Sequence, residues 1–238
     1  MIATAADLKS QIKDINTTGK EHLKNIHCID LEEDATTHRI INAIAQIPPL
    51  KYAVSISGFM SKAQLPENTE YILHLPSCID FTGAFSNVIN LTKLTFTGLN
   101  DFAQFRLSGA FMGCKQLEEV DFGIELLYTT TLNSAFTNCH NLKRVRGVLS
   151  PYECEDKAIN FMFAYELEEI RFDVEVITVK MSFRDSSKLS VQSVQSIVDG
   201  LAEVDTQLTL TLNSAVSLTD EQKATINDKG WTLVLYNK

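Results

Sequence analysis

The segment AFMGCKQLEEVDF, residues 110–122, returns three more times at nearly constant spacing. The other copies are AFSNVINLTKLTF (84–96), AFTNCHNLKRVRG (135–147) and NFMFAYELEEIRF (160–172). The phenylalanine near the start of each copy recurs every 25 or 26 residues, and a leucine follows it six residues later. A fixed period in the twenties predicts a stack of similar coils, a solenoid, in place of an ordinary globular fold.

Each copy combines two local periods. Phe111, Cys114 and Leu117 lie three residues apart, which favours a tight, 3₁₀-like turn with one apolar edge. Val120 and Phe122 then alternate with acidic residues, as in a short strand. One such coil cannot bury its apolar edge alone, so we expect neighbouring coils to stack and join their strands into a parallel sheet.

Outward positions of the predicted strands form columns of charge from coil to coil. Two columns alternate in sign or polarity: Lys93, Glu119, Arg144 and Glu169; Thr92, Glu118, Lys143 and Glu168. Adjacent strands lie about 4.8 Å apart, so opposite charges in these columns should pair on a solvated face. A third column runs from Thr95 and Asp121 to Arg146 and Arg171. Its two arginines are the residues we expect to contact an anionic partner group.

The consensus AFxxCxxLxxVxF resembles the BspA-like leucine-rich repeat family over roughly residues 55–190, including weaker copies at Phe59 and Phe183. The resemblance implies an α/β solenoid with a parallel sheet, and a non-enzymatic protein that binds proteins, glycans or surfaces. Two units depart from the family pattern: Ala164 stands where cysteine is usual, and the unit at 183–189 lacks the strand consensus. Residues 50–189 are therefore predicted to form the leucine-rich repeat body.

Composition excludes several classes of function. The chain has 238 residues, a net charge of −9 and a hydrophobic content of 45%. An acidic chain is poorly suited to bind a nucleic-acid backbone. No apolar run is long enough for a membrane span, and the N-terminus lacks the apolar core of a secretion signal.

Cys114 and Cys139 hold equivalent repeat positions, which predicts neighbouring buried, reduced thiols.

No catalytic or cofactor motif is found. The adjacent Cys139 and His140 resemble a nucleophile and base, but neighbours in sequence should point apart and the repeat directs Cys139 inward. Neither a CxxC pair nor calcium-loop spacing is present, so no metal site is expected. A hydrolase on this scaffold is the least supported hypothesis, and we expect no enzyme activity and no cofactor.

The first 49 residues follow a different pattern and are predicted to form a helical anchor module. Leu8, Ile12 and Ile15 form one apolar stripe of a first helix. A second helix is predicted from Thr36 or Thr37 towards Ile47, ended by two prolines. The pattern resembles a short helical module near the start of many phage tail and baseplate proteins. The apolar stripe would suit contacts with other virion proteins or symmetric self-assembly.

Residues 190–238 are predicted to form an α/β cap on the open end of the stack. Ser190 begins one helix, and Thr219 with Gln222 makes the capping box of another. Strands are expected at 208–212 and in WTLVLY (231–236), with Trp231 in the core of the cap. The string LTDEQKATINDKGWTLV resembles the ending of leucine-rich repeat proteins from gut bacteria and their phages.

Together these features predict a non-enzymatic structural protein of a phage virion, associated with its tail, baseplate or fibres. It would be made in the host cytoplasm, join the particle through residues 1–49, and present the repeat body to a neighbouring protein or a host-surface protein or glycan. The alternative is a bacterial adhesion or interaction protein of the BspA-like class.

Overall fold

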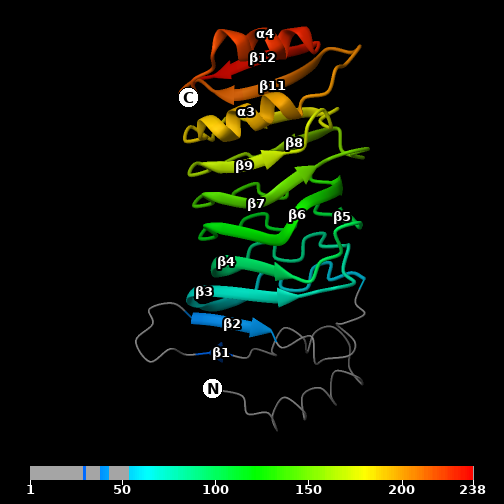
Figure 1. Cartoon of the computed structure of the whole chain (residues 1–238). Helices are drawn as coiled ribbons and strands as arrows, with labels where there is room; N and C mark the ends of the chain where they lie inside the picture. Colours follow the sequence, from blue (N-terminus) through cyan, green and yellow to red (C-terminus); the bar gives the residue numbers. More distant parts are fainter. Residues whose placement is uncertain (1–28, 31–37, 43–53, 238) are drawn as a thin grey trace.

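The computed structural model describes residues 29–30, 38–42 and 54–237, which form two mainly parallel sheets with few helices (Figure 1). The strands of the eight-stranded sheet are β1 (Ile29–Asp30), β2 (His38–Asn42), β3 (Gln64–His74), β4 (Ile89–Thr97), β5 (Gln104–Arg106), β6 (Glu119–Thr131), β7 (Arg144–Ser150) and β9 (Glu169–Phe172). The strands of the four-stranded sheet are β8 (Ala158–Asn160), β10 (Lys180–Phe183), β11 (Leu208–Asn213) and β12 (Trp231–Tyr236). The described helices are α3 (Val191–Gly200) and α4 (Asp220–Asp228).

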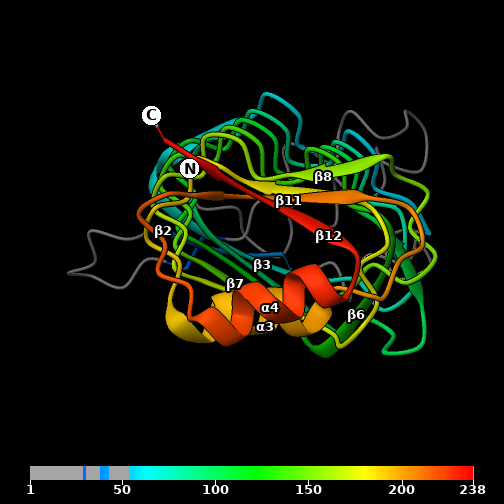
Figure 2. The same ribbon diagram turned by 90° about the horizontal axis from the view of Figure 1, so that it is seen from above.

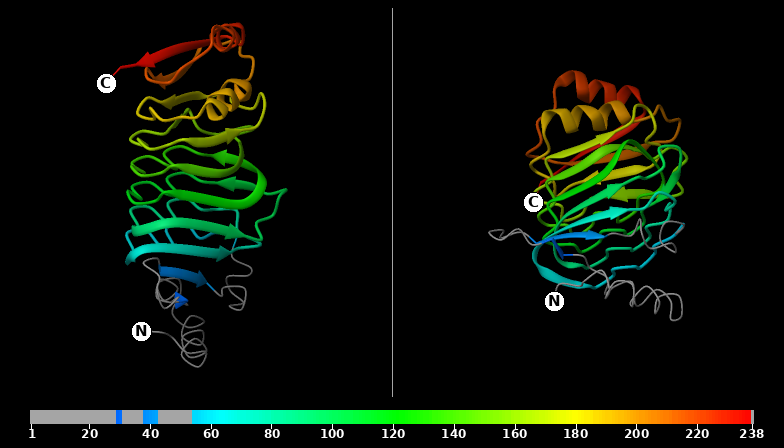
Figure 3. Two further views of the ribbon diagram at one scale, coloured as in Figure 1. Left: turned by 60° about the vertical axis from the view of Figure 1, so that its left-hand side comes forward. Right: turned by 60° about the horizontal axis from the view of Figure 1, so that its bottom comes forward.

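The two sheets lie on opposite sides of a core, and successive strands climb along one axis (Figures 2 and 3). The larger sheet follows the order β1-β2-β3-β4-β6-β7-β9, with β5 beside β6, and the smaller sheet follows β12-β11-β10-β8. Among the described strands, every pairing is parallel except that of β1 with β2. The predicted parallel sheet is therefore confirmed.

The repeated phenylalanines form a continuous column in the core. The rings of Phe85, Phe111, Phe136, Phe161 and Phe183 stack in that order, with centroids 5.8, 5.2, 5.8 and 4.5 Å apart and interplanar angles of 17° or less. All five rings are buried. Burial of an aromatic ring and its stacking both stabilise the fold, so each coil depends on the coils above and below it.

The turn around each phenylalanine is bonded to the next coil through its backbone. Gly109 and Gly113, two residues on either side of Phe111, have φ values of +59° and +78°. This left-handed backbone, which glycine adopts without a steric penalty, directs alternate N–H groups of the turn along the stack. The N–H groups of Gly109, Phe111 and Gly113 donate to the carbonyls of Asn133, Ala135 and Thr137 at 3.0, 2.9 and 2.8 Å.

The two equivalent cysteines are buried and free, as predicted. The Cys114 thiol donates to the Phe85 carbonyl at 2.8 Å, and the Cys139 thiol donates to the Phe111 carbonyl at 3.0 Å. Burial raises the pKa of Cys114 to about 12 and that of Cys139 well above its ordinary value. Both groups therefore act as small packing residues and not as nucleophiles.

The prediction of a second helix between residues 36 and 47 is wrong for its central part. Residues His38–Asn42 form strand β2, which pairs in parallel with β3 and places Ile40 beside Tyr71. Isoleucines favour a strand when the edge of a sheet is available to pair with them, and β3 provides that edge. The predicted first helix, with Leu8, Ile12 and Ile15, lies outside the described residues.

The predicted helices and strands of the C-terminal part are all present. Ser190 caps α3, Thr219 and Gln222 form the capping box of α4, and β11 pairs with β12. Trp231 is buried, and its indole N–H donates to the Ala202 carbonyl at 2.9 Å. Both helices lie on the side of the eight-stranded sheet, while β11 and β12 extend the other side (Figure 2).

Replacing Phe136 with alanine should lower the free energy of unfolding by about 3–5 kcal/mol, because the ring is buried between two stacked neighbours. Phe102 is 92% exposed, so Phe102→Ala serves as the matched control and should change stability by less than about 0.5 kcal/mol. Urea unfolding of both variants checks this. Equal losses in the two variants would contradict the stacked core.

Candidate binding groove

A bulge in β3, where its pairing with β4 is irregular, shapes the outer face of the large sheet. Gln64 pairs with Ile89 and Thr69 pairs with Leu91, so residues 65–68 of β3 have only Asn90 opposite them in β4. Asn68 adopts a left-handed backbone with a φ of +53°. Such bulges bend a strand and redirect its side chains, and they are common beside binding sites. Here the bulge places Glu67 and Asn68 along one wall of a groove.

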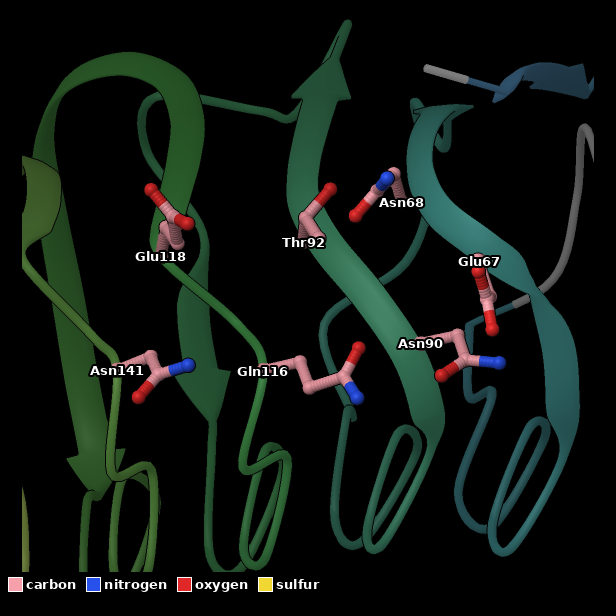
Figure 4. Close-up of a pocket in the computed structure, with 7 residues that line it drawn as sticks. All are labelled: Glu67, Asn68, Asn90, Thr92, Gln116, Glu118 and Asn141. Atoms are coloured by element: carbon pink, nitrogen blue, oxygen red, sulfur yellow. The ribbon is translucent and has the colours of Figure 1, made fainter. Parts of the chain in front are cut away.

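The groove consists of two adjoining hollows of about 390 and 430 Å³. Asn68, Thr92 and Glu118 line both hollows, so the two are continuous. Figure 4 shows the first hollow, with side chains from successive coils in two rows. The first hollow is completed by Glu67, Asn90, Gln116 and Asn141, and the second by Glu70, Lys93, Glu119 and Arg144.

One row of the groove is a ladder of amides. Asn90, Gln116 and Asn141 each lie five residues after the repeat phenylalanine, at equivalent positions of successive coils (Figure 4). The Asn90 amide donates to the Leu65 carbonyl at 2.8 Å. Within the described residues, the side chains of Gln116 and Asn141 make no hydrogen bond to protein groups, and both residues are exposed. Each amide therefore offers a donor and an acceptor to a ligand.

The second row supplies hydroxyl and carboxylate groups. The Thr92 hydroxyl donates to the Thr69 carbonyl at 3.0 Å, which leaves its oxygen able to accept from a ligand. The Glu118 carboxylate pairs with Lys143 at 2.8 Å. Donors and acceptors thus alternate over a few ångströms, and this arrangement suits polyhydroxylated or main-chain ligands better than an apolar one.

Glu119 is the centre of the charge network at the end of the groove. Its side chain is only 6% exposed and lies 2.9 Å from the Lys93 ammonium, 2.7 Å from Arg144 Nε and 3.1 Å from Arg146 Nε. The predicted column is confirmed, because Lys93, Glu119, Arg144 and Glu169 are register partners. The Oε1 atom has the two ion-pair contacts with Lys93 and Arg146 but no well-aligned hydrogen bond.

The surroundings of Glu119 change its acidity. Burial by itself raises the pKa of the carboxyl group, but the contacts with Arg144, Lys93 and Arg146 outweigh burial and hold the pKa at about 2. The carboxylate therefore stays charged across the physiological pH range. It ties the side chains of three coils into one rigid wall of the groove.

The two arginines predicted to bind an anion lie in different settings. Arg146 is exposed and already paired with Glu119, while Arg171 is exposed on β9. The expectation that both occupy successive positions of one column is wrong, because Arg171 is the register partner of Val148. Gly147, with a φ of +103°, lies in a bulge where β7 has extra residues relative to β9. A joint anion site at these arginines stays a prediction.

Other candidate chemistry can be placed as well. Within the described residues, no group of three or more His, Cys, Asp and Glu side chains is arranged to hold a metal ion. Cys139 faces the core, whereas the His140 ring packs against Tyr165 with centroids 5.4 Å apart, so the two do not form a nucleophile and base pair. Among the described helices, none has the length and apolar character needed to cross a membrane.

Comparisons with known proteins do not identify relatives. No family model matches the chain, and no match was found among curated proteins or solved structures. Reasoning from the sequence singled out the charged columns, which supply Thr92, Lys93, Glu118, Glu119 and Arg144 of the groove, but it missed the row of amides. A usable signal exists, since an amide recurs five residues after Phe85, Phe111 and Phe136.

Glu119→Gln should destabilise the protein by about 3 kcal/mol at pH 7, because it leaves a cluster of three cations without its central charge. A carboxyl group whose pKa is lowered by folding stabilises the native state above its unfolded pKa and loses this effect as pH falls. Between pH 7 and 3 the unmodified protein should therefore lose about 1–2 kcal/mol more than the variant.

Urea unfolding at several pH values checks both statements. The matched control is Glu118→Gln, because that side chain is 46% exposed and pairs with a single lysine. Its effect at pH 7 should be below about 1 kcal/mol. A pH dependence that is the same in Glu119→Gln and the unmodified protein would mean that Glu119 is not a main source of acid sensitivity.

Proposed function

We propose that the chain is a non-enzymatic binding protein with a BspA-like leucine-rich repeat solenoid as its body. The observation that carries the proposal is the continuous polar groove across β3, β4, β6 and β7, on the outer face of the large sheet. Its amide row and its charged end provide hydrogen-bonding groups held at the spacing of the coils. A groove of this chemistry recognises a glycan or an extended polar segment of a protein.

The setting we propose is a phage virion, in which the protein is associated with the tail, baseplate or fibres. Support comes from the resemblance of both ends of the chain to segments of phage proteins. Residues 1–49, with the stripe Leu8, Ile12 and Ile15, would contact other virion proteins. The repeat body would then present the groove to a neighbouring protein or to the host surface. A bacterial BspA-like adhesion protein is the alternative, favoured by the same groove but not by the phage-like ends.

The groove can be tested by removing two of its amides together. Gln116→Ala combined with Asn141→Ala should weaken binding to a glycan array, or to particle proteins, at least tenfold, because both amides are exposed and, among the described residues, hydrogen-bonded to no protein group. Gln192→Ala on α3 is the matched control, since it removes an exposed amide outside the groove. Unchanged binding by the double variant would place the ligand elsewhere.

The virion setting requires a separate experiment. Deletion of residues 1–48 should abolish incorporation into purified particles, because it removes the proposed anchor. Circular dichroism and thermal unfolding of the same variant control for loss of the repeat body. Cryo-electron microscopy of the intact particles should reveal the stacked coils joined through their N-terminal end. Normal incorporation of the shortened chain would contradict the anchoring role, and the absence of the protein from particles would favour the adhesion alternative.

A further inference from the structure

The two sheets end differently at the C-terminal end of the stack. The last strand of the large sheet, β9, is covered by α3 through side-chain hydroxyl groups. The Ile170 N–H donates to Ser193 Oγ at 3.0 Å, and the Phe172 N–H donates to Ser196 Oγ at 2.8 Å. These bonds satisfy backbone donors that would otherwise be open to a further strand.

The small sheet has no such cover. Its last strand, β12, pairs with β11 over six consecutive residues without a bulge, and in the described part of the chain no strand pairs with its other edge. The strand sequence WTLVLY contains no charged residue and no proline. Proteins normally protect an open edge with lysine, proline, a bulge or a covering segment. Within the part of the chain that the structure describes, the edge of β12 carries none of these features.

The row of inward-facing apolar side chains in the small sheet also ends without a strand that covers its last member. Leu212 and Leu235 are register partners, so their side chains lie on the same, inward face of the sheet. Leu212 is completely buried, but Leu235 is 49% exposed, and its neighbour Val234 is 41% exposed. In earlier coils the next strand buries this position. At β12 no described strand covers this position.

A hollow of about 630 Å³ adjoins the beginning of the same strand. Ile226 of α4, Gly230 and the first three residues of β12, Trp231 to Leu233, line one part of it, and the rest of the lining includes the charged Asp205 and Lys223. The exposed pair Val234 and Leu235 lies towards the other end of the strand. If β12 of a second copy paired with this strand in antiparallel orientation, the end of that second strand, at Val234 and Leu235, would lie beside this hollow. The uncharged edge of β12 can therefore pair with the same edge of a second copy.

We propose that β12 pairs in antiparallel orientation with β12 of a second copy of the chain, which gives a closed two-fold dimer. Leu235 lies on the same face of β12 as Trp231 and Leu233, so the exposed Leu235 of each copy would contact the hollow of the other copy. Two-fold symmetry makes both contacts the same and leaves no free edge. The whole chain carries a net charge of −9, which opposes self-association, but the uncharged strand allows two copies to meet without like charges in register.

The mass of the full chain in solution tests the dimer. Light scattering after size exclusion should give twice the chain mass of 26.6 kDa at micromolar concentration. Leu235→Lys should raise the dimer dissociation constant at least tenfold, because it places two charges at the paired edges. Val191→Lys is the matched control and should leave the dimer intact, since Val191 is 76% exposed at the start of α3.

Hydrogen exchange gives a second measurement that needs no substitution. Amide protons of Trp231–Tyr236 should become better protected as the concentration rises through the dimer range, while those of β10 should not change. A monomer at all concentrations would overturn the proposal, and so would a dimer that Leu235→Lys leaves intact. Neither outcome depends on the ligand of the groove, so the dimer and the proposed function succeed or fail separately.

Discussion

The structure depends on hydrogen bonding and ring stacking between one coil and the next. A single coil has neither a core nor partners for the backbone of its turn, and both come from its neighbours. The backbone bonds from Gly109, Phe111 and Gly113 to the following coil and the stacked rings on either side act along the same axis. Together they fix the spacing of every outward side chain, including those of the groove.

This internal regularity allows the outer face to vary. The inward phenylalanine and cysteine positions change little from coil to coil, whereas the outward positions carry amides, acids and bases. The groove lies where these variable outward positions adjoin the bulge of β3 at residues 65–68. At its other end the buried Glu119 holds three cations in place, so the groove has a rigid charged wall beside an open row of amides.

Most of the periodic architecture can be predicted from the sequence, because the repeated phenylalanine, cysteine and leucine positions indicate which side of each coil is buried. The register of Glu119 with Arg144 follows from the same period. Features that break the period could not be predicted. Strand β2 depends on the edge offered by β3, the bulge at Gly147 moves Arg171 out of its column, and residues 65–68 form a bulge within β3. Each is decided by pairing with another segment and not by local preference.

The column of stacked phenylalanines also constrains how this chain can change in length. Small differences in coil length are absorbed outside the column, since Phe161 and Phe183 stack although they are 22 residues apart and the other rings are 25 or 26 residues apart. A large insertion or deletion within the repeats keeps each ring above the one before when it adds or removes a whole coil, about 25 residues. Gain or loss of entire coils is therefore the large change in length that disturbs the core least. It would lengthen or shorten the outer face in fixed steps.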